Sequence, residues 1–190
     1  SAQEERSHGW MGVRYQNRPN GPANQIILHV KMWDNSRLQQ QDALGMLGVN
    51  LLHMAFHPSK NPKERITALL ESLSSKRIEV NMIRFSGPDL DHLDNRLMSL
   101  ELVHQGLTEA VLFGTNHTVL HASDSLYHKQ LFVLRGTFRP VTNTNLEVLT
   151  KGLAQFKKHP LYDGKETETL FEITMNNLAR TGEIDNEDFL

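Results

Sequence analysis

The stretch Ile26–Met32 (IILHVKM, residues 26–32) predicts a β-strand, and the kind of sheet that this strand enters decides the fold. Ile26 and Ile27 are both apolar, so neither of the two alternating faces of the strand is purely polar. Strands that are apolar on both faces are typical of parallel or mixed sheets, in which helices cover both sides. The stretch therefore predicts a parallel or mixed α/β sheet.

Helical and extended segments alternate along the rest of the chain. We expect further strands over residues 78–85, 110–113, 118–121, 130–134 and 169–175, with a hairpin at Gly114 between the second and third of these. Helices are expected over residues 37–57 and 146–159. A further helix should begin at Pro62, after the cap residue Asn61, and another should follow the Phe85–Arg96 stretch and stop at Gly106. The alternation predicts an α/β fold: a mixed, mostly parallel sheet of about five strands, with helices on both faces and one hairpin.

Two local patterns predict how these elements pack. Gly45 and Gly48 lie beside the apolar stripe of the helix over residues 37–57. Glycine costs about 1 kcal/mol relative to alanine inside a helix, so the pair predicts a close approach of this helix to the sheet, or a kink. In the strand over residues 78–85, simple alternation places residues 78, 80 and 82 on one face and residues 79, 81 and 83 on the other.

The chain length of 190 residues predicts one domain, or one domain with an extension. Residues 1–24 are polar and are expected to be irregular, or to form an edge strand around Trp10–Tyr15, and residues 25–190 are expected to form one α/β domain. Residues 182–190 have the cap and the acidic first turn of a helix that has no body. We therefore expect the chain to be a fragment of a longer protein.

Composition excludes several function classes. The net charge is −2 and no basic run is longer than Lys157–Lys158, which argues against nucleic-acid binding. The absence of cysteine excludes disulfides, thiolate zinc sites and a cysteine nucleophile, and it fits a cytoplasmic protein. No apolar run is long enough to span a bilayer, so we expect no membrane partner.

The stretch Phe85–Arg96 (FSGPDLDHLDNR) is the first candidate site, because it follows a strand and begins a helix. Asp91 and Asp94 are predicted to bind a divalent metal such as Mg²⁺ or to act as acid and base. Ser86 and Gly87 would offer backbone N–H groups to a phosphate that also pairs with Arg96. The alternative is that Asp89 or Asp91 is the N-cap of the helix and that Asp94 completes an acidic cluster in its first turn.

The stretch Arg135–Thr142 (RGTFRPVT) is the second candidate site, and it also follows a strand. Arg135 and Arg139, with the backbone amides of Gly136 and Thr137, are predicted to clamp a phosphate or carboxylate. If the strands are parallel, both candidate sites lie along one rim of the sheet, where open α/β sheets bind ligands. The alternative is a network of structural ion pairs, in which this basic loop balances the acidic Phe85–Arg96 stretch across the rim.

Other catalytic signatures are absent or weak. His53 and His57 are one helical turn apart, but no third ligand is near them in the sequence, and a polar helix end explains them better. The chain has no phosphate-binding P-loop, no dinucleotide-binding glycine motif and no hydrolase nucleophile elbow.

At DNRLMSLELVHQGLTEAVLFG (residues 94–114) and LFVLRGTFRPVT (residues 131–142), the chain resembles a family of uncharacterised bacterial proteins. Some members of that family carry the label nicotinate-nucleotide adenylyltransferase. The His-x-Gly-His phosphate motif of that activity is absent from this sequence. The resemblance implies a bacterial protein that is longer than this chain, and it implies no residue roles.

Two functional hypotheses follow. In the first, the chain is a domain that binds a nucleotide or another phosphorylated small molecule at the rim of the sheet. In the second, it is a non-catalytic interaction domain that packs on the missing C-terminal part of its own chain or on a second copy. The residues leave open whether the protein is an enzyme.

Overall fold

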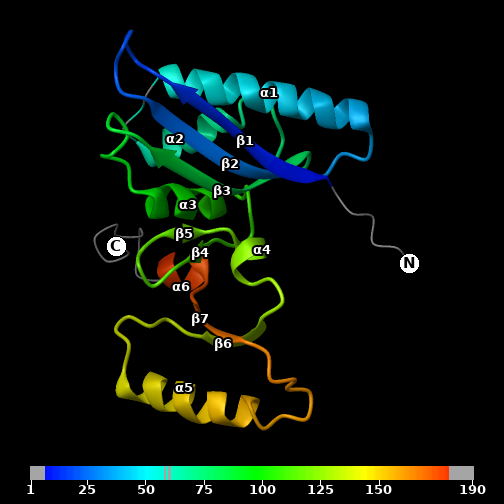
Figure 1. Ribbon diagram of the computed structural model, residues 1–190, viewed down its shortest axis with the longest axis vertical. Coiled ribbons are helices and arrows are strands. Elements are labelled where there is room, and N and C mark those ends of the chain that lie inside the picture. Colours follow the sequence, from blue (N-terminus) through cyan, green and yellow to red (C-terminus); the bar gives the residue numbers. More distant parts are fainter. Residues whose placement is uncertain (1–6, 58, 60, 180–190) are drawn as a thin grey trace. The chain divides into compact units, whose positions relative to one another are not determined.

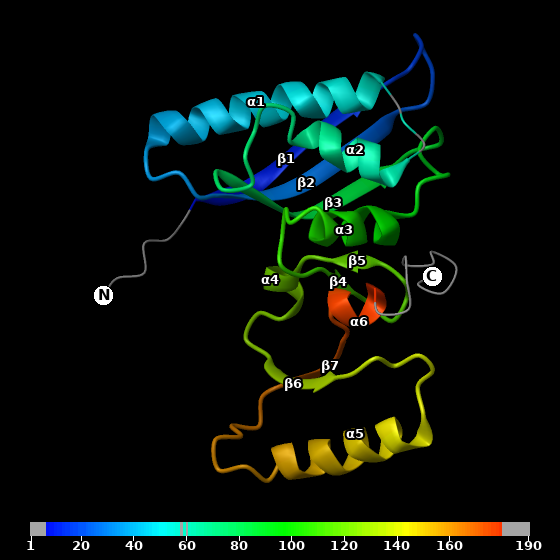
Figure 2. The ribbon, with the colours of Figure 1, turned by 180° about the vertical axis from the view of Figure 1, so that it is seen from behind.

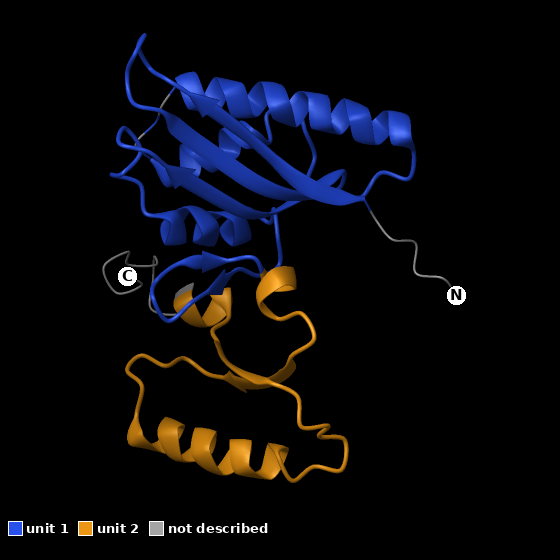
Figure 3. Cartoon of the chain, viewed as in Figure 1, with its two compact units in different colours: residues 1–121 blue, residues 122–190 orange. Residues whose placement is uncertain are grey.

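The computed structural model describes residues 7–57, 59 and 61–179. The chain divides into two compact units, which comprise residues 1–121 (unit 1) and 122–190 (unit 2) and are coloured separately in Figure 3. Residues 182–190, where the sequence predicts the start of a further helix, lie outside the described residues.

Unit 1 contains a three-stranded antiparallel sheet, in which β2 (Asn24–Met32) lies between β1 (His8–Tyr15) and β3 (Ile78–Ser86) (Figure 1). The prediction of a mostly parallel sheet of about five strands is therefore wrong. The described strands instead form this sheet, one antiparallel pair and one parallel pair.

The connections explain the strand directions. Two helices, α1 (Arg37–Phe56) and α2 (Pro62–Leu69), connect β2 to β3. Each short turn between these elements reverses the chain, so β3 is antiparallel to β2. A single crossover helix would return it parallel. The local apolar character of residues 26–32 reports burial, but it carries no information on direction.

The helices of unit 1 pack on one face of this sheet, as Figures 1 and 2 show from opposite sides. Ile26, Leu28 and Val30 of β2 form the centre of the core together with residues of α1, α2 and α3 (Asn95–His104). The prediction of helices on both faces is wrong for this sheet. The opposite face of β2 carries Ile27 and the buried His29, and this is why the strand appears apolar on both sides.

A β-bulge in β3 changes the predicted faces of that strand. His29 pairs with Met82 but the next residue, Val30, pairs with Val80, so Asn81 is an extra residue in the ladder. The bulge moves Ile83 onto the core face with Val80, and the predicted simple alternation is wrong beyond residue 80.

α1 is continuous over 20 residues, and Gly45 and Gly48 do not approach the sheet. A Cβ atom built on either glycine would have no neighbouring atom within 4 Å. The predicted close approach is therefore wrong, because both glycines lie away from the core face that Leu47 and Leu51 form.

A capping residue sets the start of α2 as expected. Asn61 accepts a hydrogen bond from the backbone N–H of Lys63, with Pro62 in the first turn of α2. The expected hairpin is also present, with β4 (Leu112–Phe113) antiparallel to β5 (Val119–Leu120).

Unit 2 contains one β-α-β segment. β6 (Gln130–Arg135) and β7 (Thr167–Glu172) are parallel, and α5 (Asn143–Phe156) connects them, while α4 (Ala122–Ser125) and α6 (Met175–Ala179) flank them in sequence. α5 approaches β6 at Gly152, where a Cβ would lie 2.8 Å from the Phe132 ring. Within the described ranges, no helix combines the length and the apolar character needed to cross a membrane.

Candidate functional site

The turn between β3 and α3 contains the first set of predicted site residues. Asp94 is the N-cap of α3 and accepts a hydrogen bond from the backbone N–H of Arg96 at 2.8 Å. The Arg96 guanidinium also donates to both Asp94 oxygens, at 3.2 and 2.8 Å, and it lies 3.1 Å from His117 Nδ1 in the β4–β5 turn. The hydrogen bonds from Arg96 hold the pKa of Asp94 below its ordinary value. Asp94 and Arg96, predicted as ligand-binding groups, therefore bind one another.

Asp89 has a structural role that the sequence did not reveal. Its Oδ2 accepts hydrogen bonds from Asn17 and Asn24, each at 2.8 Å, and its backbone N–H donates to Asn24 Oδ1 at 3.1 Å. The two amide donors hold the pKa of Asp89 below its ordinary value. This network joins the β1–β2 loop to the turn after β3.

Gly87 is required by the same network. Its φ is +117°, and a Cβ there would lie 2.6 Å from Asn24 Oδ1 and 2.8 Å from the Ala23 carbonyl oxygen. Asn95 closes the turn by accepting from the Phe85 N–H and donating to the Phe85 carbonyl. Ser86 is the last residue of β3, opposite Gln25.

Asp91 has an exposed side chain in this turn. Among residues 7–57, 59 and 61–179, no group of three or more His, Asp or Glu side chains has an arrangement that could hold a metal ion. Metal binding or acid–base chemistry by Asp91 and Asp94 stays a prediction.

The second set of predicted residues lies in unit 2, at the end of β6. Arg135 donates to both carboxylate oxygens of Glu172 in β7, at 3.0 and 2.8 Å. The backbone N–H of Gly136 donates to the Glu172 carbonyl at 3.1 Å, while Thr137 and Arg139 are exposed. Arg135 thus forms an ion pair with Glu172, a partner that the sequence did not indicate, and phosphate binding by this loop stays a prediction.

The two predicted sites do not share a sheet. The turn with Asp94 follows β3 of the antiparallel sheet, and the loop with Arg135 follows β6 of the parallel pair. The single rim of a parallel sheet, which was expected to bring them together, is absent because the described strands form three separate sheets.

A cluster of aromatic and imidazole rings lies on the face of the three-stranded sheet that is opposite the helices. His29 is buried beneath Trp10, its cross-strand partner, and their ring centroids are 5.0 Å apart. His121, which follows β5, lies 4.1 Å from His29 between ring centroids, and the His8 and His29 rings are in hydrogen-bond contact at 3.2 Å. His29 Nδ1 donates to Asn81 Oδ1 at 2.7 Å, because an amide oxygen only accepts.

Sequence analysis missed this cluster because its members come from β1, β2 and the end of unit 1. The one available signal was a histidine inside the apolar stretch of residues 26–32. Burial is the main cause that lowers the pKa of His29, so the ring is neutral at pH 7. We interpret the cluster as packing that covers the second face of β2.

A different surface lies on the outer side of α1. Four apolar side chains are exposed there: Leu38 (75%), Val49 (66%), Leu52 (49%) and Phe56 (53%). Together with the exposed Gly45 they form what we call the outward stripe, on the side of the helix opposite the core residue Leu47.

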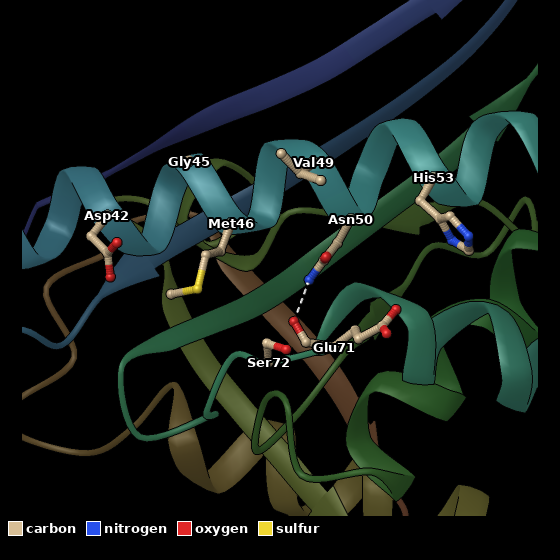
Figure 4. Close-up of a pocket in the computed structure, with 8 residues that line it drawn as sticks. All are labelled: Asp42, Gly45, Met46, Val49, Asn50, His53, Glu71 and Ser72. Atoms are coloured by element: carbon tan, nitrogen blue, oxygen red, sulfur yellow. Dashed lines mark hydrogen bonds between the residues drawn. The ribbon is translucent and has the colours of Figure 1, made fainter.

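A shallow groove runs along one flank of the outward stripe, between α1 and the end of α2 (Figure 4). Met46 and Val49 provide its apolar lining, and Asp42, His53 and Glu71 lie around it. Asn50 donates to the carbonyl oxygens of Leu69 and Glu71, at 2.9 and 2.8 Å, and these bonds fix the wall of the groove against α1.

Searches for relatives add no information about this surface. No protein-family model, curated protein or solved structure matches the chain. The resemblance to a family of uncharacterised bacterial proteins stays a prediction.

Proposed function

We propose that unit 1 is a protein-interaction module and that its contact surface is the outward stripe of α1 with the adjoining groove. The observation that carries this proposal is the exposure of four large apolar side chains along a single helix. Single scattered apolar residues on a surface are normal, whereas a group of them on one side of a helix is typical of a contact surface.

The composition of α1 supports the proposal. Arg37 and Asp42 are the only Asp, Glu, Lys or Arg residues in its 20 positions, although such residues make up 22% of the chain. Depletion of charge is the compositional feature of the centre of protein interfaces. A helix that only shielded the core would carry charged residues on its outer side.

The state of the predicted catalytic groups supports a binding module over an enzyme. Asp94 and Arg96 pair with each other, and Asp89 is held by Asn17 and Asn24. Groups that already satisfy one another locally lose those bonds when they engage a ligand. The lack of cysteine fits the action of this module in the cytoplasm.

Cysteine labelling tests the proposal, because the chain has no natural thiol. Val49→Cys places a thiol in the outward stripe, and Leu161→Cys places the control thiol at a position that is 81% exposed in unit 2. In dilute purified protein both thiols should react with a maleimide at similar rates. In the cells that produce the protein, Val49→Cys should react at least about tenfold more slowly than Leu161→Cys, and a tenfold difference corresponds to about 1.4 kcal/mol of protection.

Equal labelling of the two thiols in cells would refute a contact surface on α1. Slow labelling of Val49→Cys in dilute purified protein, independent of concentration, would also refute it, because the stripe would then be covered within the single chain.

A further inference from the structure

We propose that the outward stripe pairs with the same stripe of a second copy of this chain. The two α1 helices would be antiparallel, and the two-fold axis would pass between them at the level of residue 47 along each helix. This inference rests on the proposed function and adds the identity of the partner.

The spacing of the stripe is the first argument. With Asp42, which lies in the same line, the stripe residues follow one another at steps of 4, 3, 4, 3 and 4 residues: Leu38, Asp42, Gly45, Val49, Leu52 and Phe56. Steps of three and four keep side chains in one line along a helix, since each residue turns it by about 100°. This is the heptad spacing of helices that pack side by side.

The order of steps is the second argument, because it is the same in both directions. A two-fold interface requires that the same surface meets itself with residue i on j and j on i. In an antiparallel pair, Leu38 meets the second copy's Phe56, Gly45 meets the second copy's Val49, and Asp42 meets the second copy's Leu52. The two large residues meet at the ends, and near the axis a glycine without a side chain faces a valine.

Space around the glycines permits this contact. A Cβ at Gly45 or at Gly48 would meet nothing within 4 Å, so a neighbouring backbone can approach α1 closely there. Both glycines are near the middle of Arg37–Phe56, which is where the two-fold axis passes. Glycine is unfavourable inside a helix, and close packing against a second helix offsets that cost.

Charge is the third argument. A surface that pairs with itself places each charge near its own copy, so it must carry few of them. Asp42 is the only charged residue in the line of the stripe, and it forms an ion pair of 3.0 Å with Arg77, which also pairs with Asp34. Arg37, at the start of α1, would lie beside the negative C-terminal end of the second copy's helix.

The expected dimer is weak, because one helix of about 30 Å presents an interface at the low end of specific interfaces. Analytical ultracentrifugation over a concentration series should show a shift from the 21.7 kDa chain to twice that mass. Val49→Glu should hold the chain at the mass of a monomer at every concentration. Leu161→Glu, at an exposed site in unit 2, should leave the dimer unchanged.

Cysteine cross-linking tests the orientation of the two helices. In the antiparallel pair, residues 38 and 56 of different copies lie opposite one another, whereas two copies of residue 38 are about 27 Å apart along the axis. An oxidised mixture of Leu38→Cys and Phe56→Cys should therefore give a disulfide dimer, and neither variant alone should give one. A disulfide dimer from Leu38→Cys alone would overturn the antiparallel arrangement.

The two proposals fail separately. If the purified chain is a monomer at all concentrations but Val49→Cys is still shielded in cells, the self-pairing is wrong and the interaction surface stands. If Val49→Cys is unshielded in cells as well, both are wrong. If Val49→Glu forms the same dimer as the unaltered chain, the copies meet at another surface and this inference is overturned.

Discussion

Alanine substitution at Gly87 gives a sharp test of the packing at the turn after β3. The backbone there has a φ of +117°, and an added Cβ would lie 2.6 to 2.8 Å from atoms of Ala23 and Asn24. Two of these three atoms belong to the backbone and cannot rotate away. Asn24 is fully buried and holds Asp89, so its displacement also weakens that network.

Gly106 is the matched control for the backbone strain. It also has a positive φ, of +70°, but a Cβ there would meet nothing within 4 Å. Gly106→Ala should therefore cost only the strain of a left-handed conformation, about 1 to 2 kcal/mol. Gly87→Ala adds overpacking of about 1 to 3 kcal/mol to a similar strain, so we expect it to lower the free energy of unfolding by roughly 2 to 5 kcal/mol.

Urea unfolding followed by tryptophan fluorescence measures both variants. The two tryptophans, Trp10 and Trp33, both belong to unit 1, so the signal reports the unit that contains both glycines. With an m value of about 2 kcal/mol/M, the extra cost should lower the midpoint of Gly87→Ala by about 0.5 to 1.5 M below that of Gly106→Ala. Equal midpoints for the two variants would refute the close contact between Gly87 and Asn24.

Three further predictions concern unit 1, and the same fluorescence assay measures each of them. Leu47→Ala should lower the free energy of unfolding by about 2 to 5 kcal/mol because this core side chain is fully buried. Leu38→Ala, in the exposed stripe, should change it by less than about 0.5 kcal/mol in dilute protein. Similar losses for the two variants would show that the stripe is part of the core. Asp94→Ala should cost about 1 to 2 kcal/mol through loss of the N-cap of α3, and Asp94→Asn, which keeps a capping oxygen, should cost less; an equal cost for both would argue against the cap. On acidification, the stability of unit 1 should fall in two stages. Burial lowers the pKa of His29, so the contribution of His29 to stability is complete above the ordinary histidine pKa of about 6.5 and is lost as the pH falls through the lower folded value. The lowered pKa of Asp94 gives a further loss of stability below about pH 4. His29→Phe should remove the first stage, and a first stage that persists in this variant would assign it to another group.

Local chemistry in the sequence predicted much of the secondary structure. Asn61 and Pro62 marked the start of α2, and Gly106 follows the end of α3, because caps and glycines act on their immediate neighbours. The sequence placed the cap of α3 at Asp89 or Asp91, whereas the cap is Asp94, because several acidic residues precede this helix and each is a suitable cap. These features depend on residues within one or two helical turns.

Strand direction and side-chain partners could not be obtained in this way. Ile26–Met32 is apolar on both faces because helices cover one side and the His29 cluster occupies the other, which produces the same pattern as a parallel strand between two helical layers. The number of helices between β2 and β3 was the better guide, since two short reversals return the chain antiparallel. Asp89 binds Asn17, which is 72 positions away, and no local pattern contains that information.

The distribution of the core along the chain has a consequence for biosynthesis. The clustered core residues of unit 1 all lie between Tyr15 and Leu107, and its sheet pairs strands that are neighbours in chain order. A ribosome adding about 5 to 20 residues per second needs several seconds to complete unit 2 after the last of these residues is made. A small domain of this kind folds within that time, so unit 1 can reach its native state before unit 2 is complete. The outward stripe of α1 is then presented on a folded surface before the chain is released.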